Sequence, residues 1–162
     1  MLVERRAPSK RISKRALTVW RIHGLIHSLI IIAVSIGLTV VSFLNDWPFY
    51  VWLSGIGVAI LYTIFFVAVL PSLRWKRWRY EVRDLEIELQ HGVIFVKRTL
   101  IPMVRVQHVD TIQGPILRPF KLATITISSA ATVHEIPALD EGEADDLRNS
   151  ISSLARVAED DV

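Results

Sequence analysis

Two stretches decide the fold: Ile22–Leu44, IHGLIHSLIIIAVSIGLTVVSFL, and Pro48–Leu70, PFYVWLSGIGVAILYTIFFVAVL. Each stretch has 23 residues and contains no Asp, Glu, Lys or Arg. A helix of that length measures roughly 34 Å, enough to cross a hydrocarbon core of about 30 Å. Because a bilayer offers the backbone no water, each stretch is predicted to be a helix that satisfies its own hydrogen bonds. The sequence therefore predicts a two-helix transmembrane hairpin over residues 19–71.

Basic residues flank this hairpin on both sides, whereas the connection Asn45–Trp47 has none. The cations of the N-terminal tail, residues 1–18, are Arg5, Arg6, Lys10, Arg11, Lys14 and Arg15. This tail lacks an apolar period and is predicted to be disordered. The positive-inside rule places both termini in the cytoplasm, which gives a multi-pass protein of the plasma membrane. The charge of the tail is either a topology signal alone or a means of attracting anionic lipid headgroups.

A basic and aromatic segment follows the second span, whose helix is predicted to end at Pro71. We call it the exit segment, and its residues are Arg74, Trp75, Lys76, Arg77, Trp78 and Arg79. It is the candidate membrane-interface and lipid-binding site, because indole rings favour the headgroup level and cations attract anionic lipid. At the other end of the hairpin, Asn45 or Asp46 is predicted to cap the second helix, with Pro48 in its first turn.

Two features inside the spans leave alternatives open. Two pairs of small residues lie four apart: Ala33 with Gly37, and Gly55 with Ala59. They permit close helix packing, either within the hairpin or against another membrane protein. His23 and His27 could hold a metal ion or haem, or they could make interfacial or interhelical hydrogen bonds. A metal or haem site needs more ligands than these two, so no metal and no cofactor is predicted.

After Leu73 the sequence alternates between apolar and polar residues, which predicts short strands. The predicted strands include 78–82, 85–89, 93–96, 110–113, 122–128 and 133–136. Six or seven such strands in about 60 residues are typical of a compact antiparallel barrel or sandwich. An apolar stripe at 3, 4, 3, 4 spacing then predicts a C-terminal amphipathic helix. The stripe consists of Ala144, Leu147, Ile151, Leu154 and Ala158.

Several blocks of this C-terminal part resemble the bacterial pleckstrin-homology (PH) domain of the YdbS type, also called DUF304 or bPH2. The blocks are Trp78–Val82, Gly92, Ile101-Pro102, Val104–Val109, Gln113–Leu122 and Ile136–Leu139. The two preceding membrane helices also fit the layout of that family. The resemblance implies a PH-like barrel over residues 74–158, capped by the C-terminal helix and followed by an acidic tail at 159–162. The family usually has glycine where this chain has Lys121, and lysine tolerates the backbone conformations of glycine less well.

The resemblance also singles out four binding candidates: Arg105, Gln107, Arg118 and Phe120. Pro102 interrupts a strand pattern, so the segment around Arg105 is predicted to bend or bulge. Gln107 either satisfies backbone groups of that loop or contacts a ligand. Arg118 binds a carboxylate or carbonyl of its own domain, or a ligand, and Phe120 is expected in the core. In several bacteria, proteins of this type are encoded beside a larger protein with several copies of the domain, which implies such a partner.

The sequence shows no catalytic pattern. It has no G-x-x-x-x-G-K-[ST] loop, no G-x-S-x-G elbow and no H-E-x-x-H motif. The absence of cysteine excludes disulfides and thiol catalysis. His91, His108 and His134 are scattered among strand ends, and Glu86 and Glu88 are expected on a solvent-exposed strand face. We therefore predict a binding protein that is not an enzyme and does not bind nucleic acid.

Two functions from different classes remain. In the first, the PH-like module is a scaffold that docks onto another membrane protein, in particular a larger relative with several bPH2 domains. In the second, it senses anionic lipid or a small molecule at the inner leaflet, in envelope stress or antimicrobial resistance. Membrane lipids are partners in both, and a homo-oligomer is possible. The loop at Arg83-Asp84 is too short and too neutral for a phosphoinositide site.

Overall fold

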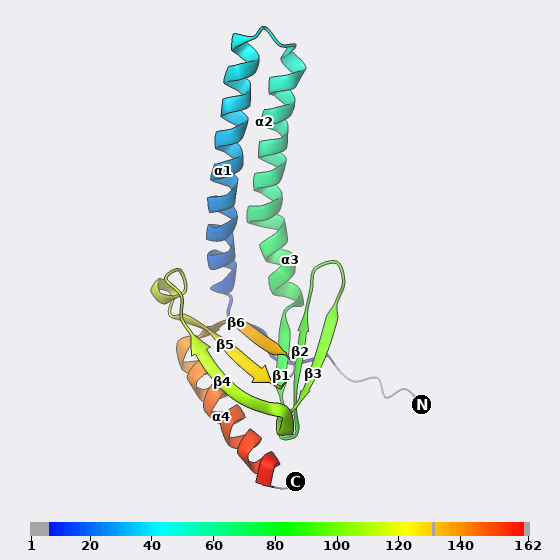
Figure 1. The fold of residues 1–162 in the computed structure, drawn as a ribbon, viewed down its shortest axis with the longest axis vertical. Coiled ribbons are helices and arrows are strands. Elements are labelled where there is room, and N and C mark those ends of the chain that lie inside the picture. Colours follow the sequence, from blue (N-terminus) through cyan, green and yellow to red (C-terminus); the bar gives the residue numbers. More distant parts are fainter. Residues whose placement is uncertain (1–6, 131, 161–162) are drawn as a thin grey trace, which may run out of the picture. The chain divides into compact units, whose positions relative to one another are not determined.

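The computed structural model describes residues 7–130 and 132–160, which form two compact units (Figure 1). Residues 17–73 form the first unit, which we call the helical hairpin. Residues 7–16 and 74–160 form the second, which we call the sheet unit. Arg5 and Arg6 of the predicted tail, and positions 161–162 of the predicted acidic end, lie outside the described residues.

Two helices form the hairpin: α1, Ala16–Leu44, and a second helix that contains α2, Phe49–Ile64, η1, Phe65–Val69, and α3, Leu70–Arg77. The first residue of α1 and the last turn of α3 belong to the sheet unit. Each of the two helices has 29 residues and is apolar enough to cross a bilayer, as predicted. The prediction that Pro71 ends the second helix is wrong, because the helix continues to Arg77. The π turn η1 ends two residues before Pro71 and widens the helix there, which gives the proline ring room.

The connection between the two helices caps the first helix and not the second. The Asn45 side-chain amide donates to the Val41 carbonyl over 2.8 Å, and Asp46 turns the chain with a φ of +53°. Pro48 is the N-cap of α2 and makes no side-chain capping bond. The predicted cap from Asn45 or Asp46 on the second helix is therefore wrong, because both residues serve to end α1.

A stripe of small residues lets α1 approach the second helix. Ser28, Ser35 and Ser42, spaced seven apart, are buried within the hairpin. The Ser28 hydroxyl donates to the Gly24 carbonyl of its own helix over 2.8 Å, so burial leaves it bonded. A Cβ on Gly24 would lie 2.5 Å from the carbonyl oxygen of Phe66. At Gly24 the two helices therefore approach so closely that a larger residue would disturb their packing.

The two predicted small-residue pairs have different places in the hairpin. Ala59 is buried, and a Cβ on Gly55 would lie 3.4 Å from the Ser35 hydroxyl, so this pair packs inside the hairpin. Ala33 and Gly37 are exposed. Within the described ranges, nothing lies within 4 Å of a Cβ placed on Gly37. The α1 pair therefore forms a face that the hairpin does not use.

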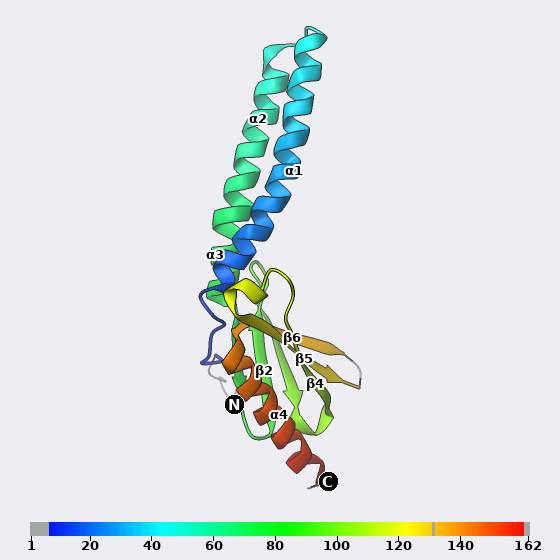
Figure 2. The same ribbon diagram turned by 90° about the vertical axis from the view of Figure 1, so that its left-hand side faces the viewer.

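The sheet unit contains two three-stranded antiparallel sheets (Figure 1). The strands are β1 (Arg79–Val82), β2 (Glu86–His91), β3 (Lys97–Pro102), β4 (Val106–Ile112), β5 (Leu122–Ser129) and β6 (Val133–Asp140). Each sheet is a simple meander, in the orders β1-β2-β3 and β4-β5-β6. The helix α4, Glu141–Asp160, packs on the second sheet (Figure 2). This confirms the predicted β-rich module with a terminal helix, but the sheets do not close into a barrel.

Alternate residues of both sheets and one face of α4 form the core. Its large, fully buried side chains include Ile87, Leu89, Met103, Ile125, Ile127, Ile136, Leu139 and Ile151. The predicted stripe of α4 contributes Ala144 and Leu147 beside Ile151. Full burial of an aliphatic side chain is worth about 1.5–3 kcal/mol, so this layer holds the two sheets and the helix together.

Glu86 and Glu88 share one face of β2. The prediction that this face is open to solvent is wrong. Glu88 is only 4% exposed. The Arg83 guanidinium, in the β1–β2 turn, donates to Glu81 over 2.6 Å, to Glu86 over 2.9 Å and to Glu88 over 3.2 Å. The same guanidinium lowers the pKa of the Glu81 carboxyl. One cation thus balances three carboxylates, which is why two acids on a strand are tolerated away from water.

The N-terminal segment is ordered against the sheet unit, so the predicted disorder of the tail is wrong for residues 7–15. Lys10 and Tyr80 exchange two backbone hydrogen bonds of 3.1 and 3.0 Å, as an antiparallel bridge beside β1. Ile12 is buried, and the Ser13 N–H donates to the Ala138 carbonyl. These contacts offset the entropy of ordering the segment, and no local pattern in the sequence encodes them.

Tyr80 also links the first sheet to α4. Its side chain is fully buried, and its hydroxyl donates to the Glu143 carboxylate over 2.7 Å. Burial and this carboxylate raise the pKa of Tyr80 well above its usual value. A tyrosine with a raised folded-state pKa stabilises the fold fully below its unfolded pKa of about 10, and this contribution is lost as the pH rises further.

We expect Gly24→Ala to destabilise the hairpin by about 1–3 kcal/mol, because the new methyl group would overlap the Phe66 carbonyl. Gly37→Ala is the matched control, since it adds the same methyl group to the same helix in open space. Thermal unfolding of both full-length variants in detergent should give a lower midpoint for Gly24→Ala alone. Equal midpoints would show that the two helices do not meet at Gly24.

Tyr80→Phe should lower the free energy of unfolding by about 1–2 kcal/mol at neutral pH, because it removes a hydrogen bond to a charged group. The difference from the wild type should shrink above about pH 10, where the tyrosine of the unfolded wild-type chain ionises. Urea denaturation of the full-length protein in detergent at both pH values measures this. Tyr50→Phe, at an exposed ring of the hairpin, is the control. A difference that stays constant with pH would contradict the assignment.

Candidate functional site

The exit segment begins in α3 and ends in β1, and its two indole rings are held inside the sheet unit. The Trp75 indole N–H donates to the carbonyls of residues 12 and 13, each at 3.2 Å, and the Arg11 guanidinium lies 5.5 Å above its ring. Trp78 is buried and stacks on the His91 ring at 5.8 Å between centroids. Both rings therefore bind the chain that leaves the membrane span to the rest of the sheet unit.

The cations of the exit segment lie closer to the surface than its aromatic rings. Arg74, Lys76 and Arg77 are exposed in the last turn of α3, where the helix dipole favours positive charge. Arg15, directly before α1, donates to the Phe120 carbonyl and to Asp140. Positive charge is thus present at both points where the chain passes between the units. Lipid binding by the exit segment stays a prediction.

Arg105 and Gln107 lie together at a groove in the sheet unit with a volume of about 350 Å³. The short turn η2, Met103–Arg105, follows β3, and the register of β4 on β5 then shifts between Val106 and His108. This confirms the predicted bend or bulge. The rim of the groove also includes the polar side chains of Ser129, Thr132 and His134.

The groove presents polar groups that the fold does not use. Arg105 and Gln107 are exposed, and neither side chain forms a hydrogen bond or ion pair with any residue of the described ranges. The predicted bond from Gln107 to backbone groups of this loop is not formed within the described residues, whereas Gln113, just past the far end of β4, donates to the Leu122 carbonyl over 3.2 Å. A guanidinium and an amide that line one groove are suited to binding carboxylate or peptide carbonyl oxygens.

Arg118 and Phe120 lie away from this groove, in the turn η3, Arg118–Phe120, between β4 and β5. Arg118 is exposed, and in the part of the chain that the structure describes its side chain forms no hydrogen bond or ion pair. Phe120 is only half-buried, so the expectation that it lies in the core is wrong. Lys121 ends the turn with a φ of +52°, a conformation that glycine adopts more easily. The four binding candidates are therefore divided between the groove, which has Arg105 and Gln107, and the turn η3, which has Arg118 and Phe120.

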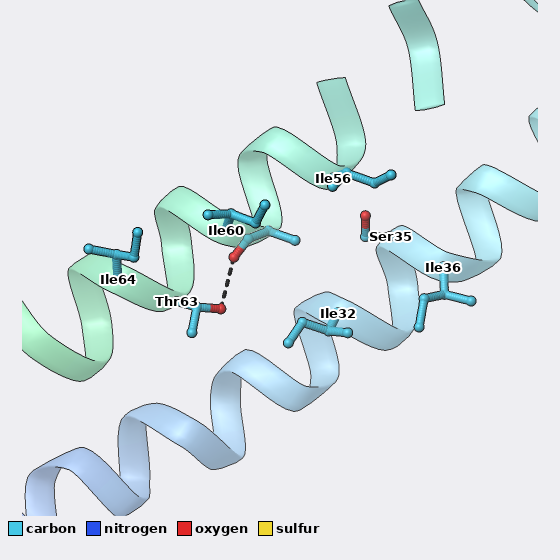
Figure 3. Close-up of a pocket in the computed structure, with 8 residues that line it drawn as sticks. Ile32, Ser35, Ile36, Ile56, Ile60, Thr63 and Ile64 are labelled. Atoms are coloured by element: carbon cyan, nitrogen blue, oxygen red, sulfur yellow. Dashed lines mark hydrogen bonds between the residues drawn. The ribbon is translucent and has the colours of Figure 1, made fainter. Parts of the chain in front are cut away.

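A second cavity, of about 420 Å³, lies between α1 and α2 (Figure 3). Most of its lining is isoleucine: Ile32, Ile36, Ile56, Ile60 and Ile64. The hydroxyl of Thr63 is bonded to the Ala59 carbonyl of its own helix over 2.8 Å. None of the lining residues is ionisable, so the cavity offers apolar contact but no acid–base chemistry.

The prediction of a strand at residues 93–96 is wrong, because these residues form the β2–β3 loop and β3 begins at Lys97. Gly92 reverses the chain with a φ of +117°, and a Cβ there would overlap the Phe95 carbonyl. Ile94 and Phe95 consequently stand at the tip, 83% and 87% exposed. The signal in the sequence is an unalternated apolar run between a glycine and two cations, where a turn is normally polar.

The histidines do not gather into a site. In the described ranges, no group of three or more His, Asp or Glu could hold a metal ion. His23 contacts the Val19 carbonyl of its own helix at 3.0 Å. Burial and the nearby cations Lys97 and Arg74 lower the pKa of His91, which favours the neutral ring where it stacks on Trp78.

Two membrane helices that carry a pair of small antiparallel sheets and a terminal helix define a membrane-anchored, PH-like protein. The sequence model of the family described as the bacterial PH domain matches residues 19–155, and the chain belongs to this family. It is 49% identical to the UPF0699 transmembrane protein YdbS of Bacillus subtilis (strain 168) over 160 residues, which cover 98% of this chain and 99% of that relative. The predicted family and the membrane location are confirmed.

A larger protein shares only part of the chain. The UPF0699 transmembrane protein YdbT of the same organism is 29% identical over 84 residues, which cover 51% of this chain and 17% of YdbT. Neither relative carries the name of an enzyme. No solved structure matches the chain.

Proposed function

We propose that the protein is a membrane-anchored docking module, whose sheet unit binds another membrane protein and performs no catalysis. The observation that carries this proposal is the groove at Arg105 and Gln107. The side chains of both residues are exposed, line the same groove and form no hydrogen bond or ion pair within the described ranges. A charge-assisted hydrogen bond to a partner's carboxylate contributes about 1.5–3 kcal/mol, so a few such bonds give useful affinity.

Both termini lie in the cytoplasm in this proposal. Arg11, Lys14 and Arg15 precede α1, and further cations end α3, whereas the connection at 45–48 contains only the acid Asp46. The positive-inside rule favours this orientation. The sheet unit then meets its partner on the cytoplasmic side of the plasma membrane.

The partner that fits best is a larger membrane protein of the same family. The segment of YdbT that matches this chain occupies only 17% of YdbT, which leaves room for further copies of the domain. The unused face at Ala33 and Gly37 supplies a second contact, because small residues let a helix of the partner approach closely. A second copy of this chain is the competing partner.

A photo-crosslinking amino acid in place of Gln107 should capture the partner in living cells, because this side chain is exposed at the groove. We expect mass spectrometry of the adduct to identify a second membrane protein with a bacterial PH domain. Arg105→Ala should reduce co-purification of that protein about tenfold, a loss of about 1.4 kcal/mol. Control variants are the crosslinker at Asp146, exposed on α4, and Arg148→Ala on the same helix.

Three outcomes would contradict this function. Adducts that contain only lipid would contradict docking, as would equal adduct yields from Gln107 and Asp146. An adduct with a second copy of the chain would replace the larger partner by a homo-oligomer.

Recognition of anionic lipid by the exit segment is a second candidate. Arg74, Lys76 and Arg77 are exposed in the turn of α3 that ends the membrane helix. Each basic residue close to an anionic surface contributes about 1 kcal/mol. Sensing of inner-leaflet composition would follow from this contact alone.

Lys76→Gln combined with Arg77→Gln should lower several-fold the amount of phosphatidylglycerol that remains on the detergent-purified protein. Native mass spectrometry measures the retained lipid, with phosphatidylcholine as the neutral reference. Arg148→Gln, on α4, is the control for loss of charge away from the exit segment. Equal retention of both lipids by the wild-type protein would reject the sensing function.

A further inference from the structure

The β2–β3 loop is the most exposed apolar feature of the described sheet unit. Ile94 is 83% exposed, Phe95 is 87% exposed and Val96 is 47% exposed. The positive φ of Gly92 fixes the chain reversal that places these side chains at the tip of the loop. Adjacent apolar side chains at a hairpin tip mark a surface that another apolar phase covers.

This loop lies beside the residues that leave the membrane helix. His91, at the base of the loop, stacks on Trp78 of the exit segment. Arg74, the first residue of the sheet unit after the span, lies close enough to His91 to lower its pKa. Figure 1 shows the loop at the same end of the sheet unit as the last turn of α3. Because the chain is continuous at residues 73–74, the part of the sheet unit that carries the loop is joined directly to the membrane helix.

Charge behind the tip favours a lipid surface over a protein partner. Lys97 and Arg98 follow the apolar run directly, and both are exposed. Arg98 donates to Gln90 across the hairpin over 2.9 Å, which holds its guanidinium at the base of the loop. An apolar tip with cations one step behind it matches the change from acyl chains to phosphates at a bilayer surface.

We propose that the β2–β3 loop inserts Ile94 and Phe95 into the bilayer as a third membrane contact, with Lys97 and Arg98 at the phosphates of anionic lipids. The two helices fix where the chain crosses the membrane, and the loop restricts how far the sheet unit tilts on that anchor. This contact requires no protein partner, so it stands or falls separately from docking at Arg105 and Gln107.

The natural absence of cysteine makes the test specific, because one introduced thiol takes one label. The full-length variants Ile94→Cys and Phe95→Cys carry a bimane fluorophore in nanodiscs of equal parts phosphatidylcholine and phosphatidylglycerol. Nitroxide quenchers are placed either on the headgroup or within the acyl chain. Val157→Cys is the matched control, an exposed apolar residue 16 positions into α4, about 24 Å along a helix that starts at Glu141.

We expect the acyl-chain nitroxide to quench the label at residues 94 and 95 several-fold more strongly than the label at residue 157. Headgroup quenching alone would show that the tip lies near the membrane without entering it, and would overturn the proposal. Quenching equal to that at residue 157 would do the same. A label that resists both lipid quenchers but enters an apolar environment when cell membranes are added would assign the tip to a protein partner.

Discussion

The arrangement of the sheet unit depends on a joint between the segment that enters the hairpin and the segment that leaves it. The backbones of Lys10 and Tyr80 exchange two hydrogen bonds, and the Trp75 indole donates to carbonyls at residues 12 and 13. The joint satisfies backbone groups of both segments that would otherwise lack a partner within the sheet unit. Joined, the two segments cover the edge of β1 and hold the chain before α1 beside the chain that follows α3.

This joint explains why so many interactions of the unit converge on β1. Tyr80 bonds to Lys10 through its backbone and to Glu143 of α4 through its hydroxyl. Trp78 stacks on His91, and Arg83 forms ion pairs with Glu81 of β1 and Glu88 of β2. A short strand of four residues is thereby connected to the N-terminal segment, to the rest of its sheet and to the terminal helix.

Features with a regular period could be predicted from the sequence, and features that depend on distant contacts could not. Uninterrupted apolar spans identified both membrane helices, and the 3, 4 spacing of Ala144, Leu147 and Ile151 identified α4. The order of residues 7–15 was missed, because it rests on Tyr80 and Ala138, which lie far along the chain. Pro71 was misread because the π turn that accommodates it has no sequence signal of its own.

The candidate site shows the same division. The break at Pro102 correctly predicted a bulge, and the bulge brings Arg105 and Gln107 to one groove. Arg118 and Phe120 belong to the same family pattern but lie in a separate turn. The sequence pattern alone does not show which of its residues are close together in the folded chain. Glu88 was expected in solvent, and only the position of Arg83 in the neighbouring turn shows why it is not.

Lys121 has a consequence for how this family can vary. An ordinary side chain in a left-handed conformation carries a strain of about 1–2 kcal/mol, which glycine avoids. The turn cannot relax, because the Lys121 backbone bonds to Arg118 on one side and to Glu141 on the other. A lineage that replaces glycine by lysine here therefore accepts this strain in exchange for one more positive charge, with the fold unchanged.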